Sequence, residues 1–175
     1  MFNVLFLRYN MLKITFLGTG TSQGVPVIAC DCSVCFSGDT RDNRLRSSIL
    51  IQTEKTTVVI DTGPHFRLQM LREKINRLDA VVFTHEHKDH ISGMDDVRAF
   101  NYKQQKHMDV YATRRVQKAL KREYPYVFAE LKYPGVPKVK LQTIVPENSF
   151  RIGDIILQPI HVMHYKLSVL GFRSI

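Results

Sequence analysis

Four potential metal ligands occur within six consecutive residues of the segment FTHEHKDHISG, which follows an apolar run. They are His85, His87, Asp89 and His90. Imidazole nitrogen is a good ligand for zinc and similar transition metals, and two histidines two residues apart can point to one ion where an extended segment curves. Four ligands this close together cannot all bind one ion comfortably. The spacing therefore favours two neighbouring ions, one bound by each pair.

A second group of potential ligands is the run CDCSVC, which contains all three cysteines of the chain: Cys30, Cys32 and Cys35. The run is too short for unstrained disulfides among its members, and none is expected without a secretion signal. Thiolates at this spacing suit a structural zinc ion that lacks one ligand. Three buried free thiols are the alternative, because an incomplete site binds metal weakly.

The glycine-rich segment GTGTSQG, residues 18–24, directly follows a strand-like run. A dinucleotide-binding turn would open a helix at once, and no helical pattern follows here. We therefore interpret the segment as a turn that lets the backbone approach the metal cleft. Its amides could still bind a phosphate group.

The elements that must position these groups follow from apolar periodicity. Helical spacing covers residues 66–78 and a second, basic segment around Val116 and Leu120, with Thr113 as the N-cap. Residues 133–146 contain three of the seven prolines and predict a loop with a short extended piece. The order of elements predicts an α/β domain with helices packed outside sheets. Strand-like runs occur at 13–17, 48–53, 57–60, 80–83, 109–112 and 155–161, and the final stretch LSVLGFRSI is also strand-like.

Composition predicts a globular protein with a basic face. The chain has 175 residues and a net charge of +9, and residues 98–140 contribute +8 of it, with 11 Lys and Arg against 3 Asp and Glu. Such a face attracts a phosphate-bearing substrate or RNA, or is simply the solvated side of a helix. Residues 1–10 have neither a signal-peptide pattern nor the length to span a membrane, so we expect a cytoplasmic protein with no membrane contact. They form either an artefactual leader or an extra edge strand.

Three segments together resemble the metallo-β-lactamase superfamily: THEHKDH at 84–90, VIDTG at 59–63 and LGTGTSQG at 17–24. Within it, the cysteine run is similar to that of the branch containing the phosphoribosyl cyclic phosphate phosphodiesterase. The resemblance extends from about Met11 to the end of the chain. It implies a metallo-β-lactamase-type αββα sandwich, formed by a single domain over residues 1–175.

The resemblance also implies the ligands of the first ion. These are His85, His87 and a later histidine, which we assign to His164 because it precedes a strand like the family's Leu-Gly-Phe-Arg strand by the usual interval. His161 is the competing assignment. The expected ion is Zn²⁺, with Mn²⁺ or Fe²⁺ as alternatives, and the cleft is expected to take up to two ions.

Asp89 and His90 match the family's ligands for the second ion, and Asp89 is the expected catalytic residue. Asp61 resembles the aspartate that orients a ligand imidazole through its other nitrogen. Family members continue beyond the segment that matches residues 171–173. Their later elements supply a bridging aspartate, a final histidine and the fourth ligand of the cysteine zinc site. We therefore expect a sandwich incomplete at its C-terminal side, or a second site completed by another protomer in a homo-oligomer.

The resemblance implies a metal-dependent hydrolase, and specifically a phosphodiesterase acting on a small cyclic or nucleotide-like phosphodiester. An RNA-processing nuclease of the same superfamily is the enzymatic alternative, and the basic segment at 98–140 fits it. The non-enzymatic alternative is an inactive, truncated remnant that still binds metal.

Overall fold

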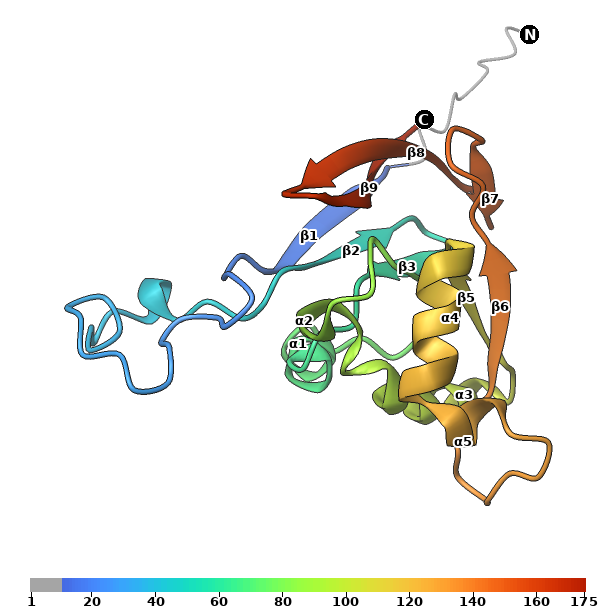
Figure 1. Cartoon of the computed structure of the whole chain (residues 1–175), viewed down its shortest axis with the longest axis horizontal. Helices are drawn as coiled ribbons and strands as arrows, with labels where there is room; N and C mark the ends of the chain where they lie inside the picture. The colour runs from blue at the N-terminus through green and yellow to red at the C-terminus, as the bar shows by residue number, and fades with distance from the viewer. Residues whose placement is uncertain (1–10) are drawn as a thin grey trace, which may run out of the picture.

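Two β-sheets pack face to face, and helices cover the outer face of the larger sheet (Figure 1). The computed structural model describes residues 11–175, so the leader or edge strand expected over residues 1–10 lies outside the described residues. The predicted α/β architecture is confirmed. The described residues supply three layers of the expected αββα sandwich, in the order helices, large sheet, small sheet.

The larger sheet has six strands in chain order, antiparallel from β1 to β3 and parallel from β3 to β6. The smaller sheet is an antiparallel meander of three strands. The six strands are β1 (Lys13–Gly18), β2 (Ser48–Gln52), β3 (Thr57–Ile60), β4 (Ala80–Val82), β5 (Met108–Ala112) and β6 (Val139–Thr143). The other three are β7 (Phe150–Ile152), β8 (Ile155–His164) and β9 (Leu167–Ser174).

The helices are short, and none within residues 11–175 has the length and apolar character needed to cross a bilayer. The longest is α4 (Arg114–Glu123), where the Thr113 hydroxyl accepts a hydrogen bond from the Val116 amide, as the predicted N-cap requires. The others are α1 (Phe66–Arg72), α2 (Lys88–Ile91), α3 (Arg98–Gln104) and α5 (Pro125–Phe128), with 3₁₀ turns η1 (Thr40–Asp42) and η2 (Met94–Val97).

Two predicted boundaries are wrong. The helix expected over residues 66–78 ends at Arg72, because Lys74 adopts a left-handed conformation (φ 52°) and the Ile75 amide turns back to the Met70 carbonyl. Residues 133–146 form the expected loop with a short extended piece, and that piece is β6, which pairs in parallel with β5. The final strand-like stretch is confirmed as β9, and the strand expected to end at residue 161 continues to His164.

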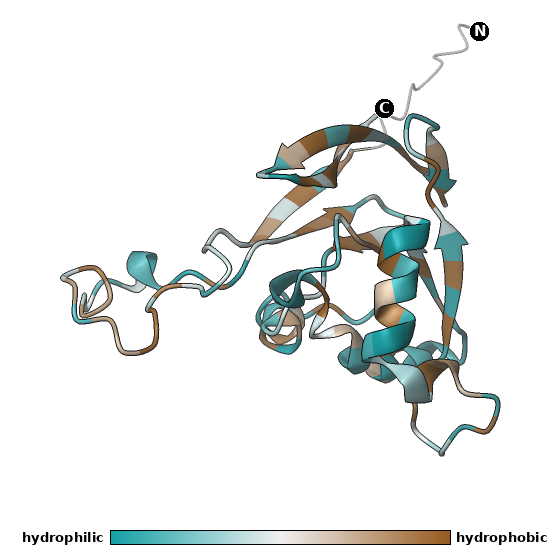
Figure 2. Cartoon of the chain, in the orientation of Figure 1, coloured by the Kyte–Doolittle hydropathy of each residue, from teal (hydrophilic) through white to brown (hydrophobic). Residues whose placement is uncertain are grey.

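Alternation along the central strands divides the interior into two cores. Val59 and Val81 point toward the helices, where they pack with Phe66 and Leu120. Their neighbours in β3 and β4 point the other way, toward the small sheet: Val58, Ile60, Ala80 and Val82. There they pack with Ile155, Leu157 and Leu170 of the small sheet to form the core between the sheets. Figure 2 shows the result on α4, where apolar residues face inward and polar ones outward. Because β3 and β4 are buried on both faces, all their residues except Thr57 are apolar.

The segment between β1 and β2 projects away from the layers as an arm that carries η1 and the three cysteines (Figure 1). At the root of the arm, Gly18 and Gly20 lie directly against the backbone of residues 44–46. A Cβ atom added at Gly18 would lie 2.0 Å from the Arg46 carbonyl oxygen. The glycines of this turn thus allow close packing against residues 44–46.

Candidate metal centre

The candidate centre lies where β3 and β4 end. Asp61 follows β3 and Thr84 begins the loop after β4, and the carboxyl ends of parallel strands meet at one edge of a sheet. From the small sheet, His164 at the end of β8 reaches the same place. The Leu170 amide of β9 donates a hydrogen bond to the Thr84 carbonyl (3.2 Å), which ties the second sheet to this loop.

Three histidines converge at this edge. The nearest potential ligand atoms of His85, His87 and His164 all lie within 4.8 Å of one another. The ring centroid of His85 is 4.6 Å from that of His87 and 5.8 Å from that of His164. His161 is not part of this group, and its Nδ1 contacts the Ser168 hydroxyl instead (3.0 Å). The geometry thus favours His164 over His161, while metal binding itself stays a prediction.

Hydrogen bonds determine which nitrogen of His85 faces the cluster. The Thr84 hydroxyl donates to Asp61 Oδ2 (2.7 Å), so its oxygen accepts the proton of His85 Nδ1 (2.9 Å). His85 Nε2 is therefore an unprotonated acceptor, and it is buried without a hydrogen-bond partner. Burial, with the nearby His90, lowers the pKa of His85 to about 4. A neutral imidazole with a buried, unshared lone pair is suited to bind a metal ion.

Asp61 joins His85 to a second pair of potential ligands. Its Oδ2 also accepts a hydrogen bond from His90 Nδ1 (2.7 Å), which leaves His90 Nε2 facing the Asp89 carboxylate at 3.2 Å. Two acceptors at that distance need a proton or a metal ion between them. Burial lowers the pKa of His90, but the hydrogen bond to Asp61 and the charges of Asp61 and Asp89 raise it above its usual value.

The backbone holds Asp61 in an unusual conformation. Asp61 has φ 64°, in the left-handed region, and its amide donates to the Val82 carbonyl while its own carbonyl accepts from the Ser48 hydroxyl. Two residues later, a Cβ atom on Gly63 would lie 2.1 Å from the Asp89 carbonyl oxygen. The loop after β3 therefore packs against α2 without side chains between them, which fixes Asp61 next to both histidines.

A cavity of about 670 Å³ opens over the centre. Thr21 and Ser22 of the glycine-rich turn line one side, together with Ser47. The other walls come from both sheets and include all the predicted cleft ligands and Asp61. The cavity is large enough for a small ester, and its lining combines hydroxyl groups, histidines and carboxylates with apolar side chains of β8 and β9.

The cysteines form a separate cluster on the arm. Their sulfur atoms lie within 4.8 Å of one another, and no disulfide joins them. Cys32 is exposed and the other two are half-buried, so the alternative of three buried thiols is wrong. Hydrogen bonds from the Cys35 amide and from Cys30 lower the pKa of Cys32 to about 7. These three thiols have the geometry to bind one ion.

Two features of the centre were not predicted. Thr84, which immediately precedes the histidine motif, sets the protonation of His85 as described above. Arg115 at the start of α4 contacts the Glu86 carboxylate (3.2 Å) and the Ser168 carbonyl, and so links α4 to the loop that carries His85 and His87 and to β9. In the sequence, the only sign of a role for Thr84 is its position next to the histidine motif. No feature of the sequence predicts the contact between Arg115 and Glu86.

The family profile described as "Beta-lactamase superfamily domain" matches residues 56–173. Among solved structures, the chain is similar to a diphosphatase of the PhnP family, with a TM-score of 0.84 and 37% sequence identity. That alignment covers 94% of this chain and 63% of the diphosphatase chain. Among curated proteins, it is 40% identical over 163 residues to an octanoyltransferase of Porphyromonas gingivalis. That match covers 93% of this chain but only 33% of the relative, so the chain spans about a third of its length.

Two more distant structures share the fold alone. Zinc-bound PqqB from Methylobacterium extorquens has a TM-score of 0.71 at 19% identity, covering 93% of this chain and 58% of that chain. The short form of human tRNase Z has a TM-score of 0.66 at 18% identity, covering 94% of this chain and 65% of that chain.

Proposed function

Because the chain belongs to the beta-lactamase superfamily, we propose that it is a metal-dependent hydrolase, and specifically one that cleaves a small cyclic or nucleotide-like phosphodiester. The family and the fold are those predicted from the sequence. The similarity to a PhnP-family diphosphatase supports chemistry at phosphate esters. We assign Zn²⁺ to the cleft, with Mn²⁺ or Fe²⁺ as alternatives, because imidazole suits all of these ions.

The proposal rests on one observation, the buried and unpartnered Nε2 of His85 within a group of three histidines. A buried polar atom without a partner costs free energy, and a bound cation would recover that cost. The donor set of three imidazoles, with an open cavity beside it, matches a catalytic zinc site, in which three protein ligands leave one position free. The residues present therefore fit the ion that the family implies.

In this proposal each side chain has a defined task. His85, His87 and His164 bind one ion, and Asp89 with His90 binds a second. A divalent ion there supplies Lewis acidity toward the phosphoryl oxygens. Asp61 keeps the proton on His90 Nδ1, so Nε2 is available as a donor atom. Asp89 lies at the cavity wall, where its carboxylate can accept the proton that the attacking water loses.

The test of this assignment is the metal content of His85→Ala. We expect the purified variant to lose most of its bound metal and its turnover of a chromogenic phosphodiester in zinc or manganese, because one of three ligands is gone. His161→Ala is the matched control, since His161 lies on the same strand outside the cluster, and it should keep the parent's metal content. If His85→Ala retains as much metal as the parent, the assignment is wrong.

For the arm we propose a separate structural Zn²⁺ bound by Cys30, Cys32 and Cys35. The three sulfur atoms within 4.8 Å of one another support it, and the lowered pKa of Cys32 favours the metal-binding thiolate at that one cysteine. Three thiolates leave the fourth position of tetrahedral zinc to another group. A Cys32→Ser variant should therefore lose one ion while it keeps the histidine-bound metal.

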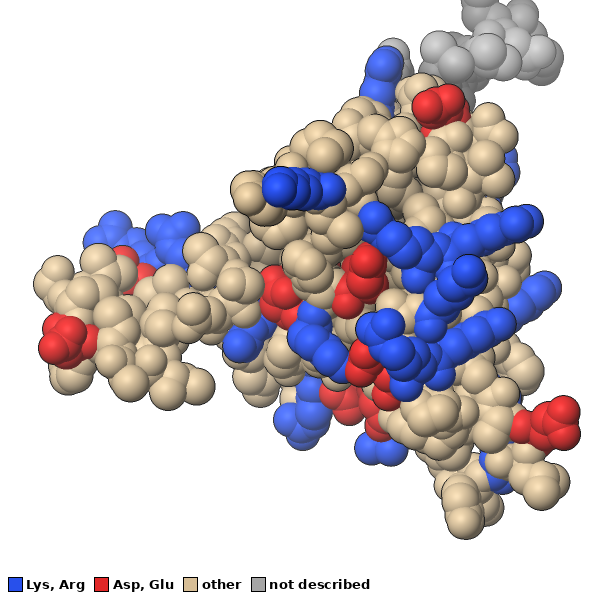
Figure 3. Space-filling view, in the orientation of Figure 1, with Lys and Arg blue, Asp and Glu red and all other residues tan. Residues whose placement is uncertain are grey.

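An RNA-processing nuclease is a second candidate, and the placement of the basic helix favours it. Figure 3 shows Lys and Arg gathered over the face that carries α4. The start of the helix contacts the histidine motif, through the ion pair of Arg115 with Glu86. Its exposed basic residues are Arg114, Arg115, Lys118, Lys121 and Arg122. A polyanion could extend along α4 with one phosphodiester in the cavity.

Salt dependence separates the two candidates. For a single-stranded RNA substrate, neutralising Lys118 and Lys121 to glutamine should reduce the slope of log affinity against log salt by about 1.4, because each phosphate contact contributes about 0.7. A control that neutralises Lys55 and Arg151, outside α4, should leave the slope unchanged. Equal slopes in both double variants would count against the nuclease and in favour of the small substrate.

A further inference from the structure

The turn between β8 and β9 presents an aromatic ring and a positive charge beside the candidate centre. Tyr165 and Lys166 directly follow His164 and form the two-residue connection to β9. A cavity of about 350 Å³ is lined by these two residues, Leu167, His87 and His164. Because His87 and His164 also line the larger cavity, the two spaces adjoin at the metal ligands. No carboxylate is among the described residues that line the smaller cavity.

Tyr165 occupies a backbone position that a bulky residue rarely adopts. Its φ is 55°, and two-residue hairpin turns prefer glycine, asparagine or aspartate where φ is positive. Its side chain is not packed in compensation, because the residue is 86% exposed. Residues held in such conformations cluster at ligand-binding and active sites. Packing of the side chain therefore does not explain a tyrosine at this position.

Lys166 completes the pair. Its Nζ lies 5.5 Å from the centroid of the Tyr165 ring, within the range of a cation–π contact. The ammonium covers one face of the ring and leaves the other free to stack. A flat apolar surface and a positive charge are thus presented together, one residue from a metal ligand.

We infer that Tyr165 and Lys166 form a subsite for the nucleoside part of the substrate, with the base stacked on Tyr165 and a phosphate oxygen paired with Lys166. The inference rests on the proposed function and deepens it, since it names a nucleoside-bearing phosphodiester as the substrate class. An aromatic ring stacks on any base, so the subsite selects for a base without selecting among bases. Lys166 adds charge attraction to the phosphate.

The first measurement separates a binding role from a structural one. Tyr165→Gly should leave the melting temperature unchanged or raise it by a few degrees, because glycine adopts positive φ freely while also losing more chain entropy on folding. Tyr165→Phe keeps the ring and should behave like the parent in binding. Tyr133→Gly is the matched control, since Tyr133 is 83% exposed and lines neither cavity. A clear fall in the melting temperature of Tyr165→Gly would mean that Tyr165 is a structural residue and would overturn the subsite.

The second measurement compares two chromogenic diesters in the metal-loaded protein, the nitrophenyl ester of thymidine monophosphate and methyl nitrophenyl phosphate. Tyr165→Gly should raise KM for the thymidine ester about tenfold, which is about 1.4 kcal/mol, in the range of one base–aromatic stack. KM for the methyl ester should change less than about twofold, because that ester has no base to stack. Lys166→Met should raise KM for the thymidine ester in the same direction. Equal effects on both esters would overturn the subsite.

Direct binding keeps this inference separate from the proposed function. If the parent hydrolyses neither ester, the hydrolase proposal fails, and titration calorimetry with AMP still tests the subsite. AMP should bind the parent about tenfold more tightly than Tyr165→Gly, with Tyr165→Phe and Tyr133→Gly close to the parent. The subsite is refuted if the parent does not bind AMP or if Tyr165→Gly binds it equally well.

Discussion

Among the residues of the centre, Thr84 controls the chemistry of two neighbours without being a potential ligand itself. Its hydroxyl donates to Asp61 and accepts from His85 Nδ1, and this relay directs the free lone pair of His85 into the cluster. Residues that orient metal ligands in this way commonly change metal affinity 10- to 100-fold when they are substituted.

We therefore predict that Thr84→Val lowers the affinity for zinc by about tenfold. Valine has nearly the shape of threonine but cannot relay the proton, so Asp61 loses a donor and His85 can rotate or change tautomer. The measurement is a competition titration with a zinc chelator. Thr84→Ser keeps the hydroxyl and should retain the parent affinity. The relay has no part in binding if Thr84→Val matches the parent while its circular dichroism spectrum is unchanged.

At the same scale, the local pattern predicts only neighbouring ligands, whereas the contacts of Thr84, Asp61 and His164 depend on the sheets, and only the resemblance indicated Asp61 and His164. The ligand types at 85, 87, 89 and 90 are evident because they are adjacent. Thr84 and Asp61 are 23 residues apart and meet only because β3 and β4 lie in parallel. His164 and His161 have the same chemistry, and only a resemblance favoured one of them. The two histidines are three residues apart and therefore lie on opposite faces of β8. The structure thus distinguishes them, because only His164 lies beside His85 and His87.

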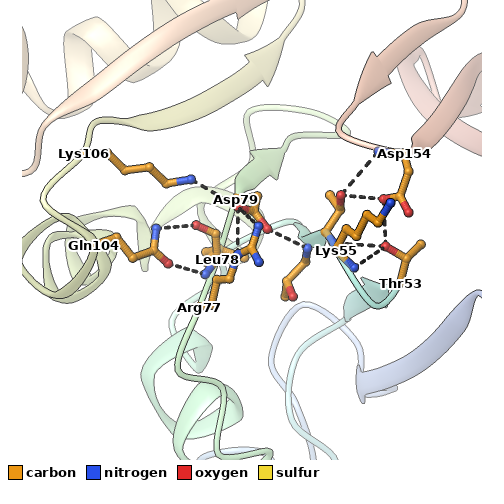
Figure 4. Close-up of polar contacts among 10 residues, drawn as sticks. Thr53, Lys55, Arg77, Leu78, Asp79, Gln104, Lys106 and Asp154 are labelled. Atoms are coloured by element: carbon orange, nitrogen blue, oxygen red, sulfur yellow. Dashed lines mark hydrogen bonds and ion pairs between the residues drawn. The ribbon is translucent and has the colours of Figure 1, made fainter.

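At the scale of elements, the ends of the strands opposite the candidate centre are joined by Asp79 (Figure 4). Its Oδ2 accepts a hydrogen bond from the Thr57 amide at the start of β3 (2.9 Å). Its Oδ1 pairs with Arg77 (3.0 Å) and with Lys106, just before β5 (3.1 Å). A second junction in Figure 4 links the sheets, where Asp154 accepts from the hydroxyls of Thr53 (2.7 Å) and Thr56 (2.5 Å).

We predict that Asp79→Asn destabilises the fold by about 1–3 kcal/mol, because it removes the ion pairs and weakens a partly buried hydrogen bond. Burial raises the pKa of Asp79, but the Thr57 amide, Arg77 and Lys106 lower it below its usual value of 3.8. Its stabilising effect is therefore present above that value and is lost as the pH falls through the lowered pKa of the folded state.

Urea unfolding at neutral pH and at decreasing pH measures this effect. The difference between the parent and Asp79→Asn should shrink as the medium is acidified below the usual aspartate pKa. Arg77→Gln removes only one of the partners of Asp79, so it should lower the free energy of unfolding by less than Asp79→Asn does. A difference that stays constant down to strong acid would show that the charge of Asp79 is not what stabilises the strand ends.

Element boundaries were predictable where an element is long enough to show a repeating apolar pattern. The predicted strand over 57–60 is confirmed as β3, and the N-cap of α4 was placed correctly. The helices α2 and α5 are four residues each, too short to show periodicity. β6 has a partly exposed pattern between prolines, and its strand conformation comes from pairing with β5. The conformation of such elements depends on tertiary contacts, which local sequence patterns do not reveal.

At the scale of the whole molecule, an apolar strip of β1 continues the core between the sheets. Ile14 pairs with Ile51 and Phe16 pairs with Ile49, and directly paired residues of antiparallel strands point to the same face. Ile51 is buried in the inter-sheet core and Ile49 packs against it, yet Ile14 is 52% exposed and Phe16 is 66% exposed. Side chains of the small sheet cover Ile49 and Ile51 on β2, but within residues 11–175 no side chains cover Ile14 and Phe16 in the same way.

We propose that a second copy of the chain covers the strip, and we predict concentration-dependent self-association by light scattering. An exposed apolar face on an edge strand favours pairing, while the net charge of +9 opposes it by repulsion. Added salt screens that repulsion and does not weaken apolar contacts, so association should increase with salt. Phe16→Asp should give a monomer, whereas Phe36→Asp, on the exposed arm, should associate like the parent. A parent that stays monomeric at high protein concentration and high salt would rule out this dimer.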